Sequence, residues 1–282
     1  MKVISTELRS HLEGEATTLA TCWKLTCRDG DVLGFTDHDE ELLIDSVNYI
    51  ASSGFNPTAV QSTSSLAVDN LDVDGVLDDA SITEENIFSG KYDFAEIEIF
   101  MVNYADLSQG ALNIKRGWIG EVSYSKQHFI AEVRGLTEKL NQKIGDIFSP
   151  TCRANLGDAK CGADLEEYTV SGEITDVSSR QVFADSALVA ASGYYNFGRI
   201  IFTSGENQGL SMEIKDYREG GAITLVLPMA FTVDVGDAFD IIAGCDKYFS
   251  TCVYKFDNAV NFRGEPHVLG LDKIMQTAST RN

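Results

Sequence analysis

The sequence contains no run of about 18 uncharged apolar residues, which is roughly the length that a transmembrane helix needs. Its first residues, MKVISTELRSHLEGEATTL, also lack the apolar stretch of a signal peptide. We therefore expect no membrane span and synthesis in a cytoplasm. Structural disulfides are disfavoured in that compartment, so paired cysteines in this chain indicate metal or redox chemistry.

Basic residues are scarce: 22 Lys and Arg stand against 43 Asp and Glu, which gives a formal net charge of -21. The imbalance is concentrated in residues 29–106, where 18 acidic residues accompany a single basic one, Lys91. Such a surface repels a polyanion, so we expect no specific nucleic-acid binding. The segment is either a solubility feature or a surface past which DNA slides.

The chain of 282 residues is 44% hydrophobic, which is enough for one large or two ordinary cores. LATCWKLTCRDGDVLGFTD predicts two strands joined by a tight turn at Asp29-Gly30. Side-chain alternation predicts Cys27 in the core and Cys22 as a half-buried thiol on the opposite face. Period-two patterns predict further strands in YIASSGF, AEIEIFMVNY, RGWIGEVSYS and HFIAEVRG.

A helix over about 137–147 is predicted by apolar residues at helical spacing, namely Leu136, Leu140, Ile144 and Ile147. It should end before Pro150. We place a domain boundary here, between an N-terminal β-rich domain (1–148) and a C-terminal domain (149–282). Strands separated by Gly-rich turns predict a small β-barrel or sandwich inserted at about 166–243. The expected fold is mainly β, with two β-rich domains and a few short helices.

Four of the six cysteines form two pairs on either side of this inserted unit. Eight residues separate Cys152 from Cys161, six separate Cys245 from Cys252, and 83 lie between the pairs. A compact unit whose ends lie close together would bring all four thiols to its base. Zinc sites usually have shorter spacings, whereas an iron–sulfur cluster accepts ligands from separate loops. The four cysteines could also form disulfides, or be buried thiols that share no site.

Glycines stand beside these cysteines at Gly157, Gly162 and Gly244. A glycine lets the backbone approach closely, so we expect their N–H groups to donate to cysteine sulfur.

A family resemblance adds to this interpretation. The pattern C-x8-C, followed at a distance by C-x6-C and FDNAVNFRGEPHVLGLDK, resembles the cluster-bearing region of tail-tip hub proteins of siphophages and gene transfer agents. GFTDHDEEL, YIASSGF, LDVDGVL, GKYDFAEIEIFMVNY and RGWIGEV resemble the N-terminal region of the same family. The resemblance covers about residues 15–272. The order of the motifs, together with both cysteine intervals, makes it specific.

The resemblance implies a [4Fe-4S] cluster whose ligands are Cys152, Cys161, Cys245 and Cys252, and no catalytic residue. It implies a homotrimeric ring at the tail tip of the virion, between the distal tail protein and a larger fibre-bearing tip protein. The implied function is that of a structural hub, made in the bacterial host cytoplasm, that takes part in tail assembly and DNA ejection. DNA would pass through its lumen without specific binding.

The segment FDNAVNFRGEPHVLG has two interpretations. It is either a turn-rich C-terminal segment held only by its own barrel or, as the resemblance favours, a loop packed over the cluster and presented to the tip protein. The loop would be built from Asn258, Asn261, Phe262, Gly264 and Pro266, with Arg263 as a donor near the cluster. Two other classes are weighed against the hub: a cytoplasmic iron–sulfur enzyme and a zinc-stapled interaction module. Iron–sulfur enzymes often leave one iron open, whereas four cysteines can saturate a cluster. We therefore predict that the protein is not an enzyme.

Overall fold

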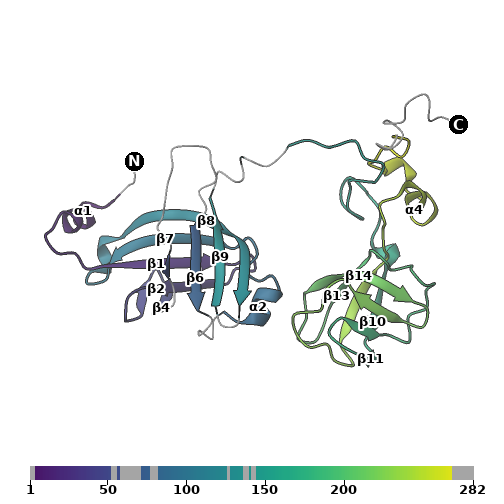
Figure 1. Cartoon of the computed structure of the whole chain (residues 1–282), viewed down its shortest axis with the longest axis horizontal. Coiled ribbons are helices and arrows are strands. Elements are labelled where there is room, and N and C mark those ends of the chain that lie inside the picture. The colour runs from purple at the N-terminus through teal and green to yellow at the C-terminus, as the bar shows by residue number, and fades with distance from the viewer. Residues whose placement is uncertain are drawn as a thin grey trace, which may run out of the picture. The chain divides into compact units, whose positions relative to one another are not determined.

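The computed structural model describes residues 4–51, 56–57, 71–76, 82–125, 128–135, 140 and 144–268. The chain divides into two compact units, Met1–Lys143 and Ile144–Asn282, so the division falls five residues before the predicted boundary. Strands are the main regular element of both units (Figure 1), which confirms the predicted fold class.

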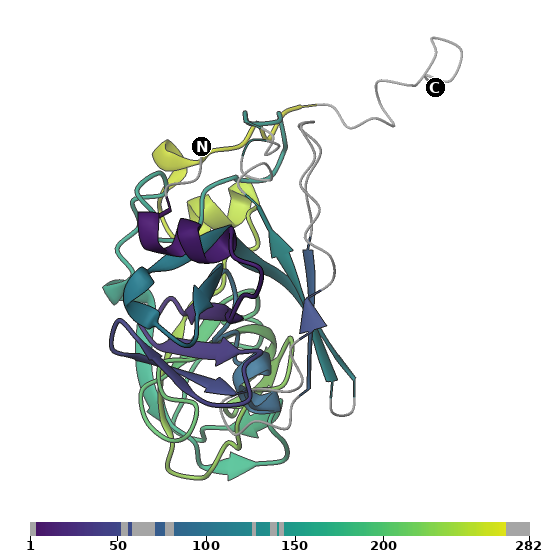
Figure 2. The same cartoon turned by 90° about the vertical axis from the view of Figure 1, so that its left-hand side faces the viewer.

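The N-terminal unit is built on a nine-stranded sheet in the order β3-β4-β2-β1-β7-β8-β9-β6-β5. Its elements are α1 (Thr6–Leu12), β1 (Leu19–Thr26), β2 (Val32–Thr36), β3 (Leu42–Ile44), β4 (Val47–Ala51), β5 (Asn56–Pro57), β6 (Leu71–Val76), α2 (Glu84–Phe88), β7 (Glu96–Asn103), η1 (Leu107–Gln109), β8 (Ala111–Ser125) and β9 (His128–Arg134). Figure 2 views this unit from one end, with α1 in front of the strands.

The predicted hairpin is confirmed: β1 and β2 pair antiparallel across a turn in which Gly30 has a φ of +97°. Trp23 and Cys27 pack into one core, together with residues of β7 and β8. Cys22 faces the opposite way and is fully buried in a second core with Tyr49 and Phe100. The expectation of a half-buried Cys22 is therefore wrong, because side chains cover both faces of the sheet here.

The C-terminal unit contains a seven-stranded sheet in the order β10-β16-β13-β14-β15-β12-β11. Its elements are η2 (Glu166–Tyr168), β10 (Thr169–Glu173), β11 (Asp176–Val177), β12 (Val182–Ala184), β13 (Arg199–Phe202), β14 (Ser211–Arg218), β15 (Ala222–Leu225), β16 (Ala238–Ile242), α4 (Phe249–Tyr254) and η3 (Ala259–Asn261). The outer strands β10 and β11 are separated by only Ile174 and Thr175, so the sheet curls into a barrel.

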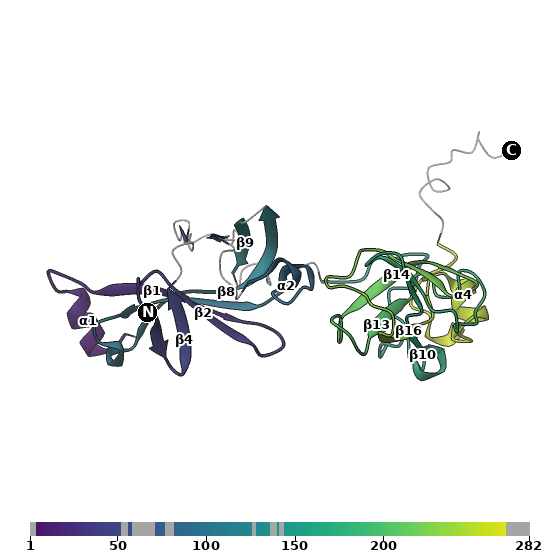
Figure 3. The same ribbon diagram turned by 90° about the horizontal axis from the view of Figure 1, so that it is seen from below.

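The barrel encloses a single apolar core in which Tyr217, Phe239 and Ile241 are completely buried. Figure 3 shows β10, β13, β14 and β16 forming one compact body. The cysteine pairs lie just outside this body, before β10 and after β16, and α4 lies beyond one end of it (Figure 1). The barrel therefore holds the two segments at its base.

The predicted helix over 137–147 is wrong from Ile144 onward, because 144–148 contains no helix. Leu140 is helical, while residues 136–139 and 141–143 lie outside the described part of the chain. Ile144 and Ile147 are fully or mostly exposed, so the apolar stripe finds no core to face. The Ile147 carbonyl instead accepts a hydrogen bond from the guanidinium of Arg153 (3.1 Å), which ties this stretch to the cysteine loop.

Candidate functional site

The first cysteine pair lies in a loop that is organised by one carboxylate. Asp158 accepts backbone hydrogen bonds from Asn155 (2.8 Å), Lys160 (2.9 Å) and Cys161 (2.7 Å). The N–H groups of Asn155 and Cys161 lower the pKa of the Asp158 carboxyl group. The Asp158 carboxylate thus fixes the loop from within and orients the backbone of Cys161.

The second pair is placed by the end of β16 and by α4. Cys245 follows Gly244 at the strand end, and Cys252 lies within the helix. Lys247 connects the two segments: its carbonyl accepts the N–H of Cys152 (2.8 Å), and its ammonium donates to the carbonyl of Ala154 (2.6 Å). Lys247 has a φ of +66°, an unusual backbone conformation for a residue with a side chain.

All four predicted ligands face one small cavity. Its lining also includes apolar and aromatic side chains: Ala154, Leu156, Tyr248, Phe256 and Phe262. Burial raises the pKa values of Cys245 and Cys252, and the other three cysteines raise that of Cys252 further. The thiolate forms of Cys245 and Cys252 are therefore disfavoured unless a positive charge compensates them, and a bound metal centre would supply such a charge.

Two sulfur atoms receive hydrogen bonds from the C-terminal segment. The backbone N–H of Arg263 lies 3.4 Å from Cys152 Sγ, and Asn258 Nδ2 lies 3.5 Å from Cys161 Sγ. The expected glycine donors are not found at Gly162 and Gly244, whose N–H groups donate to the carbonyls of Asp158 and Tyr194. The guanidinium of Arg263 points elsewhere, to the carbonyl of Lys160 (3.2 Å).

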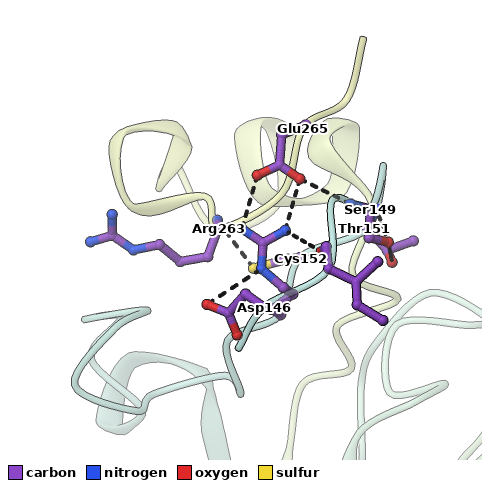
Figure 4. Close-up of polar contacts among 8 residues, drawn as sticks. Asp146, Ser149, Thr151, Cys152, Arg263 and Glu265 are labelled. Atoms are coloured by element: carbon purple, nitrogen blue, oxygen red, sulfur yellow. Dashed lines mark hydrogen bonds and ion pairs between the residues drawn. The ribbon is translucent and has the colours of Figure 1, made fainter. Parts of the chain in front are cut away.

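The same C-terminal segment is fastened to the cysteine loop by a clasp between Arg153 and Glu265. Figure 4 shows the Glu265 carboxylate with dashed contacts, one of which runs to Ser149. The two Nη atoms of Arg153 donate to the two carboxylate oxygens at 2.8 and 2.9 Å. The Glu265 carboxylate also accepts the backbone N–H of Ser149 (2.9 Å), and the Glu265 backbone N–H donates to the carbonyl of Ser149 (2.8 Å). These contacts hold the segment that contains Arg263 beside Cys152.

Replacement of Glu265 by glutamine is expected to loosen the clasp in a pH-dependent way. Arg153 lowers the pKa of Glu265 from 4.5 to about 2. Because the Glu265 carboxyl group has a lower pKa in the folded protein than in the unfolded chain, its ionised form stabilises the folded state at pH values above the unfolded-state pKa. This stabilisation is lost as the pH falls through the folded-state pKa. Hydrogen exchange of the Arg153 amide should therefore be a few-fold faster in Glu265→Gln at neutral pH, and the difference from the unsubstituted protein should shrink between about pH 4.5 and 2. A difference independent of pH would contradict this.

The structure places the sequence candidates as follows. The four cysteines come together, and Asn258, Asn261 and Phe262 line the same cavity. Cys22 and Cys27 lie apart in the N-terminal unit. Sequence reasoning missed Lys247, Asp158 and the Arg153–Glu265 clasp. Only Asp158 had a local signal, since an aspartate before a Gly-containing turn often caps backbone N–H groups.

Within the described residues, no group of three or more His, Cys, Asp or Glu side chains is arranged to hold a single metal ion. A four-cysteine zinc site needs its sulfur atoms roughly 4 Å apart around one ion. In a [4Fe-4S] cluster each cysteine binds a different iron, so the sulfur atoms stand further apart. Both kinds of centre take four cysteine ligands, and four cysteines line this cavity.

The chain was compared with known proteins. Residues 5–164 match the family described as "Baseplate hub protein, N-terminal attachment domain". Residues 193–272 match a second family, described as "Phage conserved hypothetical protein BR0599". A chain in a solved structure titled "Virion of native gene transfer agent (GTA) particle" is 37% identical, with a TM-score of 0.81 over 96% of this chain and 95% of that chain. A comparison with curated proteins found no match.

These matches define a structural protein of a phage-like tail, located at the tail tip of the virion. More specifically, the chain belongs to the baseplate hub protein family. The family match and the structural match confirm the predicted function, a structural tail-tip hub, and the predicted location in the virion. No helix in the described ranges combines the length and the apolar character of a transmembrane segment.

Proposed function

We propose that the chain is a baseplate hub whose C-terminal unit is stapled by a [4Fe-4S] cluster bound to Cys152, Cys161, Cys245 and Cys252. The observation that supports this most is that four thiols, drawn from segments 83 residues apart, face one cavity. The cluster would neutralise four buried thiolates and close a long loop, so that metal binding and folding of the barrel base are coupled. Its role is structural, and no reaction is assigned to it.

The proposal also covers how the hub assembles with itself and with other tail proteins. The hub forms a homotrimeric ring that joins the distal tail protein to a larger tip protein, and DNA passes through its lumen. Exposed aromatic side chains support an assembled state: Phe94 and Phe197 are 67% and 70% exposed, and both have a positive φ. A bulky residue in this backbone conformation is strained, and such strain is often kept where a side chain meets a partner.

The proposal is tested by purifying the protein without oxygen and measuring visible absorption, iron, sulfide and zinc. We expect a brown protein with iron and sulfide in equal amounts, about four of each per chain. Zinc without sulfide would overturn the cluster. Mass measurement of the protein, alone and within particles, tests the ring: a monomer or dimer in the particle would overturn the trimer.

A further inference from the structure

Asn258 lies between the two cysteine pairs and makes hydrogen bonds to both of them. Its side-chain Nδ2 donates to the carbonyl of Cys161 at 2.7 Å and approaches the sulfur of the same residue at 3.5 Å. Its backbone N–H donates to the carbonyl of Cys252 at 3.0 Å. One residue therefore joins a ligand of the first pair to a ligand of the second.

The orientation of the Asn258 amide is determined by its surroundings. The carbonyl of Cys161 can only accept, so the nitrogen of the amide must face it. The amide oxygen then faces Asn261, which donates to it through Nδ2 at 2.7 Å. With both ends engaged, the second N–H of the amide is directed toward Cys161 Sγ.

The backbone carbonyl of Asn258 has a different role. It accepts a hydrogen bond from the Cys252 thiol at 3.2 Å. This bond needs a protonated sulfur, so it would be lost if Cys252 bound iron as a thiolate. The donation to Cys161, by contrast, is compatible with a thiolate and grows stronger with negative charge on sulfur.

We propose that Asn258 is a positioning residue that orients Cys161 and, through its N–H···S contact, raises the reduction potential of the bound cluster. The inference rests on the proposed cluster. A hydrogen bond to a ligand sulfur withdraws electron density and stabilises the reduced, more negatively charged state. Asn258 would thereby protect the cluster from oxidative loss while the hub waits to be assembled.

The test compares the full chain with Asn258→Ala and Asn258→Asp, all purified without oxygen. The reduction potential is measured by titration followed by visible absorption or electron paramagnetic resonance, and cluster loss is followed in air and with an iron chelator. Both variants should have a more negative potential, Asn258→Asp the more so because it adds a carboxylate. Cluster loss should be about tenfold faster, as for other residues that support metal ligands.

Asn155→Asp is the matched control. Asn155 is exposed near the same cavity, and its side-chain oxygen accepts from Lys247 Nζ at 3.3 Å, a contact that aspartate keeps. The control therefore adds the same charge without removing a donor to sulfur, and its potential should shift less than that of Asn258→Asp. An unchanged potential in Asn258→Ala with a full cluster would overturn the inference. A parent protein that holds no iron and sulfide would instead overturn the proposed function.

Discussion

Cys152→Ser and Cys245→Ser are each expected to abolish the visible absorption of the cluster and to reduce bound iron and sulfide to near zero. Serine is a poor ligand for iron because its hydroxyl group deprotonates far less readily than a thiol, and the cavity is too apolar to assist. The base of the C-terminal unit should loosen as a consequence, because the two segments lose the centre that joins them. Incorporation of the hub into particles should fall in parallel.

Cys22→Ser is the control for this experiment. Cys22 is completely buried in the N-terminal unit, and burial raises the pKa of its thiol to about 11. Its sulfur donates to Thr36 Oγ1 at 3.7 Å, and a serine hydroxyl can donate there too. This variant should keep iron, sulfide and incorporation. A full cluster in Cys152→Ser, or its loss in Cys22→Ser alone, would refute the assignment of ligands.

Patterns within a short stretch of sequence predicted most of the fold. The turn at Asp29-Gly30 and the alternation on both sides of it define β1 and β2, because a tight hairpin depends only on neighbouring residues. The same alternation placed Cys22 and Cys27 on opposite faces correctly. It could not show that Cys22 is also buried, because the covering residues Tyr49 and Phe100 come from other strands.

For the helix predicted over 137–147, the pattern indicated a buried face that the folded protein does not have. Apolar spacing across 144–147 is helical, yet those residues form no helix, because Ile144 and Ile147 are exposed and have no core to face. Arg153 and Glu265 are 112 residues apart, and neither has a local signal that it will pair. The cysteine pairs were found because they flank the inserted strands and their order resembles that of the hub family, whereas the clasp joins two residues whose neighbours in the sequence give no hint of the pairing.

The second large effect is expected from Gly244→Ala, at the junction of barrel and cavity. A Cβ atom at position 244 would lie 1.7 Å from the carbonyl oxygen of Asn196 and 2.5 Å from its carbon. Both are backbone atoms, so the strand end must move and carry Cys245 with it. We expect a loss of at least about 3 kcal/mol of unfolding free energy in the C-terminal unit, at the upper end for overpacking, and a weakened cluster.

Gly209→Ala is the control for this prediction. It tests the cost of placing a side chain on a left-handed backbone without a steric clash. Gly209 lies in the same unit with a φ of +83°, and a Cβ there meets nothing within 4 Å. Its replacement should cost only about 1 to 2 kcal/mol, from the left-handed backbone alone, and should leave the cluster intact. Hydrogen exchange of barrel amides in the full chain measures both stabilities, and iron analysis reports Cys245. Equal losses in the two variants would mean that the close approach of Gly244 to Asn196 does not position Cys245.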